Sequence, residues 1–177
     1  MPLKKGQKAW NSGVGITQTM DSRRVFVETL KELARTDKNI VCIIPDVGFN
    51  YLSDPDLPFK VINLGVTEQS AMVIASALAL SGFKVFYYTM INFTLFRPYE
   101  MVRNMLVCHN APVTLLGVKG SSSYKFLGFS HNLLHDTEDF DACENIGLKW
   151  YNPKTNEEVK TAVLESFNSD KPSYIRL

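Results

Sequence analysis

The spacing of hydrophobic positions changes regularly along this chain. After Asp21, apolar residues recur at helical spacing in SRRVFVETLKELART, which predicts a first helix. The stretch IVCIIP at 40–45 is a short, nearly continuous apolar run, which is typical of a strand buried on both faces of a parallel sheet. A second such run, VINL at 61–64, precedes the Ala-rich stretch EQSAMVIASALALSG, which predicts a tightly packed helix that ends at Gly82.

The same alternation continues to the last residue. KVFYYT predicts a strand, INFTLFRPYEMVRNMLV a helix despite Pro98, and PVTLLGV another strand. A loop-rich stretch from 117 to about 138 is followed by a short helix near 137–145, a strand at LKWY, a helix at NEEVKTAVLESF and a last strand at SYIRL. The pattern predicts an α/β fold, with a mainly parallel sheet flanked by helices in a single domain over 21–177. Residues 1–20 lack periodicity and are expected to form an N-terminal arm.

Composition and charge narrow the function classes. Hydrophobic residues make up 45% and charged residues 21% of the chain, as in an ordinary globular protein. The 19 basic and 18 acidic residues give a net charge of +1, so no bulk field attracts nucleic acid or an anionic membrane. No apolar run is long enough for a signal peptide or a membrane span, which predicts a cytoplasmic location. Three widely spaced cysteines indicate neither a disulfide framework nor a CxxC metal site.

Candidate chemistry lies in the segments that follow strands, because open parallel sheets bind ligands beyond the carboxyl ends of their strands. Asp46 follows the first strand, Glu68 follows the second, and a long loop at 117–136 follows PVTLLG. Glu68 stands near the first turn of a helix, where a carboxylate is favoured by the helix dipole. Taken alone, helix capping explains this glutamate fully.

Aromatic and histidine residues are the remaining candidates. Phe93, Phe96 and Tyr99 are three residues apart, so on a helix they form a slanted stripe, which is most often part of a core. His131 and His135 could lie on one helix face as metal ligands, but the surrounding Gly and Ser favour a loop and a substrate contact. No metal site is therefore expected in this chain. Neither GxGxxG after a strand nor a Walker loop occurs.

In their order along the chain, these segments resemble the pyrimidine-binding domain of the transketolase family. The resemblance covers roughly residues 20–177 and rests on INLGVTEQ with its Ala-rich helix, YTMINFTLFRPYEMVR, GFSH inside a long loop, and the closing PSYIRL. It implies thiamine diphosphate as the cofactor. Glu68 stands at the position of the family's glutamate, which hydrogen-bonds the ring nitrogen of the cofactor's aminopyrimidine and promotes removal of the proton from the thiazolium carbon.

The resemblance also implies roles for the other candidates. The spacing F-x-x-F-x-x-Y of the family's pyrimidine pocket is reproduced by Phe93, Phe96 and Tyr99, which replaces the core interpretation. Asp46 resembles an aspartate near the thiazolium, and His131 resembles a histidine that meets the substrate. Glu68 and His131 are thus the expected catalytic residues.

Departures from the family pattern leave the substrate open. Leu127 stands where transketolases carry an aspartate that contacts a sugar hydroxyl, and Asn152-Pro153 stands where they carry Arg-Pro for the substrate phosphate. The sugar can therefore be phosphorylated, nucleotide-linked or another ketose.

The resemblance further implies a partner. No GDG motif occurs, and the family's C-terminal domain has no counterpart, so a partner chain is expected to hold the diphosphate and Mg²⁺. The chain is expected to self-associate through the Glu68 helix, with two copies of each chain in the complex. The leading hypothesis is a subunit of a transketolase-like enzyme that transfers a two-carbon ketol unit between sugars. A noncatalytic partner-binding or regulatory protein, a 1-deoxyxylulose-phosphate-synthase-like enzyme and a dehydrogenase component are the alternatives.

Overall fold

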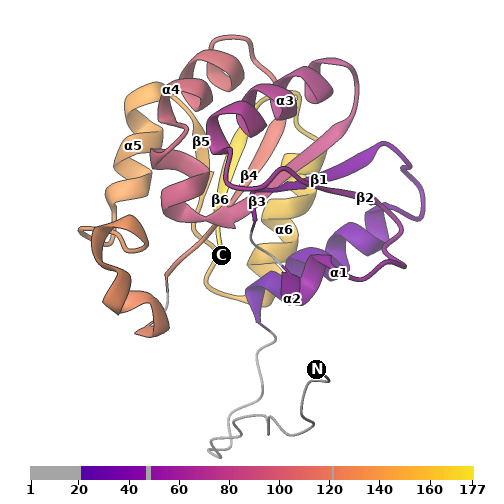
Figure 1. Ribbon diagram of the computed structural model, residues 1–177. Helices are drawn as coiled ribbons and strands as arrows, with labels where there is room; N and C mark the ends of the chain where they lie inside the picture. The colour runs from indigo at the N-terminus through magenta and orange to yellow at the C-terminus, as the bar shows by residue number, and fades with distance from the viewer. Residues whose placement is uncertain (1–20, 47–48, 121) are drawn as a thin grey trace, which may run out of the picture.

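Six parallel strands form one sheet in the order β2-β1-β3-β4-β6-β5 (Figure 1). The computed structural model describes residues 21–46, 49–120 and 122–177, so the arm predicted for 1–20 lies outside the described residues. The strands are β1 (Ile40–Ile44), β2 (Lys60–Asn63), β3 (Lys84–Met90), β4 (Val113–Val118), β5 (Lys149–Tyr151) and β6 (Ser173–Arg176). Every pairing between them is parallel, which confirms the predicted fold class.

Helices cover both faces of the sheet (Figure 1). One face carries α1 (Ser22–Leu33), the short α2 (Phe49–Leu52) and α6 (Asn156–Phe167), and these pack on one buried apolar cluster. The other face carries α3 (Glu68–Leu80), α4 (Tyr99–Met101), the π-helix η2 (Val102–Val107) and α5 (Glu138–Ile146), over a second cluster. Because both faces are covered, β1 is buried at all five positions, as its apolar run predicts. No helix in the described parts of the chain is long and apolar enough to span a membrane.

The segment after β3 departs from the sequence prediction. Instead of one helix there are three elements: a π-helix η1 (Asn92–Phe96), the single turn α4, and η2. Pro98 separates η1 from α4, and α4 runs directly into η2. Proline has no amide hydrogen and cannot continue the i→i−4 ladder, and the neighbouring amide of Arg97 donates to the carbonyl of Asn92, five residues back, at 2.9 Å. Such π-helical turns are often found at functional sites.

A buried ionic network fixes the segment between β4 and α5. Asp139, in the first turn of α5, is fully buried and accepts hydrogen bonds from two nitrogens of Arg176 and, at 2.6 Å, from the hydroxyl of Tyr174. The Arg176 guanidinium also donates to the carbonyl of Asp136 and lies 3.9 Å from the Phe140 ring centroid. Burial, together with the Asp139 charge, raises the pKa of Tyr174 well above its ordinary value. The last strand thereby holds the end of the 119–137 segment.

A substitution at Asp139 tests this anchor. Asp139→Asn should lower the free energy of unfolding by about 3–5 kcal/mol, because the buried Arg176 guanidinium loses its counter-charge. Glu144→Gln changes an exposed carboxylate on the same helix and should stay within about 0.5 kcal/mol of wild type. Urea unfolding followed by circular dichroism measures both, and equal losses in the two variants would contradict the anchoring role.

Candidate active site

The candidate residues gather at the carboxyl edge of the sheet. Asp46 follows β1, Glu68 follows β2, Phe93 follows β3 and His131 follows β4. Since all strands are parallel, these segments emerge at the same edge (Figure 1). The neighbours β1 and β3 continue into helices on opposite faces of the sheet, and such a switch point is the usual ligand site of an open α/β sheet.

Glu68 is the first residue of α3 and is almost fully buried, with 4% of its surface exposed. The preceding Thr67 does not cap the helix with its side chain; its hydroxyl donates instead to the carbonyl of Leu64 at 2.8 Å. Glu68 Oε1 accepts a hydrogen bond from Arg97 Nη1. The carboxylate therefore lies at the positive end of a helix dipole, with a guanidinium as its ion-pair partner.

Arg97 was not among the residues that the sequence singled out. It directly follows η1, its guanidinium carbon lies 4.0 Å from the ring centroid of Phe93, and 40% of its side chain is exposed. The sequence does carry a signal for it, because Arg97 is the only charged residue between Lys84 and Glu100. A single cation in such an apolar segment points to a specific anionic partner.

Tyr87 is a second residue that the sequence did not single out. Its side chain is fully buried in the middle of β3, and its hydroxyl has no hydrogen-bond partner among the described residues. Burial and then the charge of Glu68 raise its pKa, while Arg97 acts in the opposite direction. Both charges of the Glu68–Arg97 ion pair therefore act on this hydroxyl, which has no hydrogen-bond partner in the described part of the chain.

His131 lies against Phe93. The two rings meet edge to face, with centroids 5.0 Å apart, and Tyr124 stacks on the histidine at 6.2 Å. His131 Nδ1 is 2.7 Å from the hydroxyl of Ser130. The amide of Asn92 donates to backbone carbonyls of 129 and 132, at 3.0 and 3.3 Å, and so holds this segment on η1.

Asp46 is exposed at the end of β1, with a positive φ of 57°. Positive φ is uncommon outside glycine and is found often at functional sites. Its amide donates to Asn63 Oδ1 at 3.3 Å, and the same oxygen accepts from the amide of Gly65 at 2.9 Å. Asn63 therefore ties the turn after β1 to the turn that leads into Glu68.

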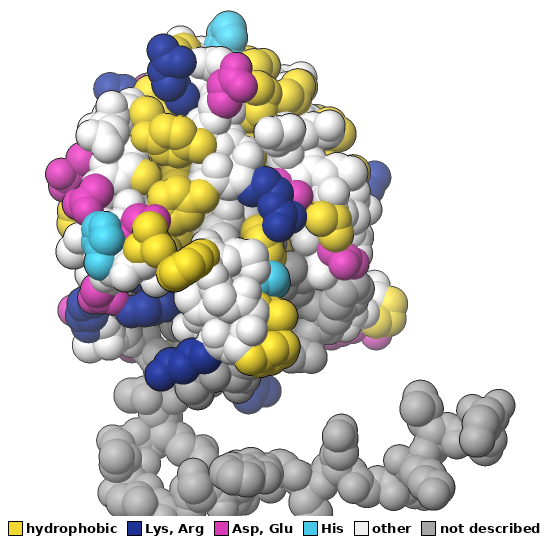
Figure 2. Space-filling view, turned by 60° about the vertical axis from the view of Figure 1, so that its left-hand side comes forward, with side chains coloured by type: hydrophobic (Ala, Val, Ile, Leu, Met, Phe, Trp, Pro, Cys, Tyr) yellow, Lys and Arg dark blue, Asp and Glu magenta, His cyan; other side chains and the backbone are white. Residues whose placement is uncertain are grey.

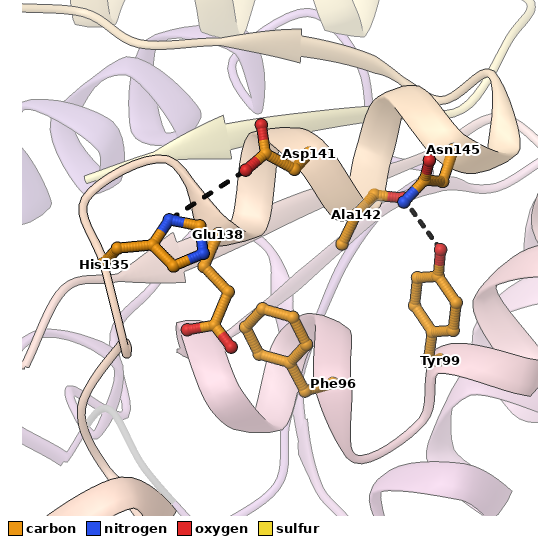
Figure 3. Close-up of a pocket in the computed structure, with 7 residues that line it drawn as sticks. All are labelled: Phe96, Tyr99, His135, Glu138, Asp141, Ala142 and Asn145. Atoms are coloured by element: carbon orange, nitrogen blue, oxygen red, sulfur yellow. Dashed lines mark hydrogen bonds and ion pairs between the residues drawn. The ribbon is translucent and has the colours of Figure 1, made fainter.

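Phe96 and Tyr99 line a hollow of about 350 Å³ against α5 (Figure 3), and Phe93 is not among its lining residues. The opposite wall consists of His135, Glu138, Asp141, Ala142 and Asn145. Tyr99 donates to the carbonyl of Ala142 at 2.9 Å. A π-helical turn holds more residues than an α-turn, so the spacing of three between these aromatics corresponds to a different angular separation here than in the α-helix that the sequence predicted.

The two histidines lie in different surroundings. His131 contacts Phe93, whereas His135 lies at the hollow, with its Nδ1 3.9 Å from Asp141 Oδ2. Within the described residues, no group of three or more His, Cys, Asp or Glu side chains is arranged to hold a metal ion.

The fold has a counterpart in a known protein family. A family model for the transketolase pyrimidine-binding domain matches residues 18–177, and the chain belongs to this family. The resemblance that the sequence motifs indicated is therefore confirmed.

Particular relatives can then be named. Over 117 residues the chain is 40% identical to a subunit of the apulose-4-phosphate transketolase of Phocaeicola vulgatus, a match that covers 64% of this chain and 38% of that protein. It is 29% identical over 164 residues to 1-deoxy-D-xylulose-5-phosphate synthase of Halothermothrix orenii, which covers 86% and 24%. The solved structure of a split-gene transketolase, an inactive beta4 tetramer, superposes with a TM-score of 0.75 at 24% identity, over 88% of this chain and 50% of that chain. The chain thus spans half or less of the length of these proteins.

Two buried tyrosines provide a matched test of the unsatisfied hydroxyl. Tyr87 and Tyr174 are both fully buried, but only Tyr174 has a hydroxyl partner among the described residues. Tyr87→Phe should leave the free energy of unfolding unchanged or raise it by up to about 1 kcal/mol, whereas Tyr174→Phe should lower it by about 1–3 kcal/mol. Chemical unfolding of both variants measures this. A loss in Tyr87→Phe as large as that in Tyr174→Phe would reveal a partner for the Tyr87 hydroxyl.

Proposed function

We propose that this chain provides the pyrimidine side of a thiamine-diphosphate active site whose diphosphate side belongs to a partner chain. The observation that carries the proposal is the buried carboxylate of Glu68, paired with an arginine whose guanidinium lies over the ring of Phe93, at the carboxyl edge of a transketolase-family sheet. Relatives in the family include a transketolase subunit and a deoxyxylulose-phosphate synthase.

The side chains around Glu68 fit an aminopyrimidine ring. Such a ring needs an acceptor for its in-plane N–H groups and an apolar face to stack on. Glu68 supplies a nearly buried acceptor, Phe93 supplies an aromatic face, and Tyr87 adds a hydroxyl without a partner in the described structure. When bound, the cofactor supplies a carbon nucleophile for attack on a carbonyl group.

Each residue has a defined part in this proposal. Glu68 exchanges a proton with the ring nitrogen of the aminopyrimidine, as a general acid and base. Phe93, with Phe96 and Tyr99 further along the same segment, lines the approach to that ring. His131 acts on the substrate, because it lies in the segment after β4, is more exposed than Phe93 and contacts the Phe93 ring edge to face.

Asp46 completes the proposed set, near the thiazolium. Its position after β1, linked through Asn63 to the turn before Glu68, supports this assignment.

The proposed reaction transfers a two-carbon ketol unit between sugars. The 40% identity to a transketolase chain supports it. The sugar itself is left open by Leu127 and Asn152-Pro153, which replace residues that contact the substrate in transketolases. The similarity to deoxyxylulose-phosphate synthase favours a synthase-type reaction as the second candidate. Two assays separate these reactions. A ketose donor with an aldose acceptor measures ketol transfer, and pyruvate with glyceraldehyde phosphate measures the synthase reaction.

Partners form part of the proposal. A diphosphate-binding chain holds the diphosphate and Mg²⁺, and two copies of this chain associate through α3. The exposed apolar residues in and around α3 support self-association: Val66, Val73, Ile74, Leu80 and Phe83. The split-gene transketolase of similar fold is an inactive tetramer of its beta chain. A cytoplasmic location stays a prediction made from the sequence.

The Glu68→Gln variant tests the catalytic assignment. In the complex with the partner chain, turnover should fall about 100-fold to 10,000-fold, because an amide cannot return the proton. Circular dichroism should show an intact fold. Turnover equal to that of wild type would remove Glu68 from the catalytic role.

His131→Ala is the contrasting variant in the same assay. It should lower turnover or donor affinity while cofactor binding stays close to that of wild type, since the proposed role lies on the substrate side. Cofactor titration by fluorescence and donor titration by initial rates separate the two effects. Loss of cofactor binding with unchanged donor affinity would contradict this role.

Isothermal titration of the isolated chain tests the need for a partner. Stacking and single hydrogen bonds contribute about 1 kcal/mol each, and the charged diphosphate has no anchor in the proposed site. The chain alone should therefore bind thiamine diphosphate and Mg²⁺ more weakly than micromolar, and tight binding and activity should appear together on mixing with the diphosphate-binding chain. Micromolar binding by the chain alone would refute the split site.

A further inference from the structure

The guanidinium group of Arg97 makes the two contacts that an aminopyrimidine needs. Its Nη1 donates a hydrogen bond to Glu68 Oε1, and its flat face lies 4.0 Å from the centroid of the Phe93 ring. A guanidinium and a protonated aminopyrimidine share the relevant chemistry. Both are planar, carry N–H donors in the plane and spread positive charge over an amidine-type group, which stacks on aromatic rings.

We propose that Arg97 occupies the aminopyrimidine site of this chain, so that the cofactor reaches Glu68 only after Arg97 has moved. This inference rests on the function proposed above. Glu68 is 4% and Phe93 is 9% exposed, so little of either group is left for a second ligand while Arg97 is in place. The arginine and the ring therefore compete for the same carboxylate and the same aromatic face.

The structure also gives Arg97 a way out. Its side chain is 40% exposed, in contrast to the buried partner, and its hydrogen-bond and ring contacts among the described residues are those with Glu68 and Phe93. A guanidinium that withdraws from this position returns to water, where its charge is well solvated. Glu68 has no such exit, because it stands in the first turn of α3 under the surface.

The physical reason for such an occupant is the cost of an unpaired buried carboxylate. Removing the counter-charge from a buried ion pair destabilises a protein strongly. Arg97 keeps the Glu68 charge paired until another planar donor takes its place. The consequence is a lower apparent affinity, because only the fraction of molecules with Arg97 withdrawn can bind the ring.

Arg97→Ala tests the inference in the full-length chain, with Arg103→Ala as the matched control. Arg103 lies in the following π-helix, is exposed, and has its side chain bonded to its neighbour Asn104 at 3.2 Å. The probe is 4-amino-5-hydroxymethyl-2-methylpyrimidine, which lacks the diphosphate and so requires no partner chain. Ligand-observed NMR titration should give binding about tenfold tighter to Arg97→Ala than to wild type, and Arg103→Ala should match wild type.

Methylguanidinium provides a second readout that is independent of the cofactor. At the same concentration it should raise the melting temperature of Arg97→Ala by filling the vacated position, and should leave wild type and Arg103→Ala unchanged or less stable. This rescue distinguishes an emptied planar-cation site from a general loosening of the fold. Circular dichroism of each variant reports that the chain is folded.

The outcomes separate this inference from the proposed function. If Arg97→Ala does not bind the aminopyrimidine more tightly than wild type, the occupant role is overturned. If Arg97→Ala binds it more weakly than wild type, or not at all, Arg97 is instead a ligand of the ring. The double variant Arg97→Ala/Glu68→Gln tests the premise. If it binds the pyrimidine as tightly as Arg97→Ala alone, the proposed function of Glu68 fails. If the Glu68 substitution abolishes binding while Arg97→Ala resembles wild type, the function stands and only this inference is lost.

Discussion

Removing a carboxylate from water is unfavourable unless donors replace the water, and the site of this chain depends on how two such carboxylates are paired. Asp139 receives donors from Arg176 and Tyr174, both on β6 and both buried. Glu68 receives a donor from Arg97, whose side chain is partly exposed. In the first arrangement every partner is buried, whereas in the second the cation reaches solvent, which is what the proposed exchange of Arg97 requires.

Parallel topology brings these two arrangements to one edge of the sheet. Arg176 ends β6 beside β4, so its ion pair with Asp139 fixes the chain just beyond the segment that carries His131. Asn92, in the π-helix after β3, donates to the carbonyls of 129 and 132, on either side of His131. The histidine is thus held from both ends, and its contact with Phe93 is a consequence of strand order rather than of sequence neighbourhood.

The sequence predicted those parts of the fold in which the pattern of apolar residues is compatible with only one kind of buried element. Apolar runs such as IVCIIP predicted buried parallel strands, and the Ala-rich run after Glu68 predicted a helix, because no other structure buries them so well. The π-helical turns around Pro98 could not be predicted, since their hydrogen bonds depend on packing between β3, β4 and α5.

Charged residues limited the prediction of the site in a similar way. A charged side chain in a sequence is most often a solvated surface residue. Arg97 is the single cation of an apolar segment, but neither Arg97 nor Asp139 indicates in the sequence which residue it pairs with. Glu68 and His131 were predicted as site residues because the motifs that contain them resemble a known family. Pairing between distant segments is a tertiary property, and only the assembled sheet revealed which cation met which carboxylate.

Two exposed apolar regions lie near Glu68 and Asp139 in the sequence. One surrounds α3 and includes Val66 and Phe83, and the other is the segment after β4, with Phe126 and Phe129 about four-fifths exposed. Hydrophobic side chains also reach the surface in a band on the face shown in Figure 2. Val66 lies two residues before Glu68, so in the proposed self-association a surface that covers Val66 comes close to the Glu68 ion pair. A lower local dielectric there strengthens the pairing of Glu68 with its planar donor. In the proposed complex, assembly and the pairing of Glu68 are therefore coupled, because burial of the interface increases the energetic difference between a paired and an unpaired carboxylate.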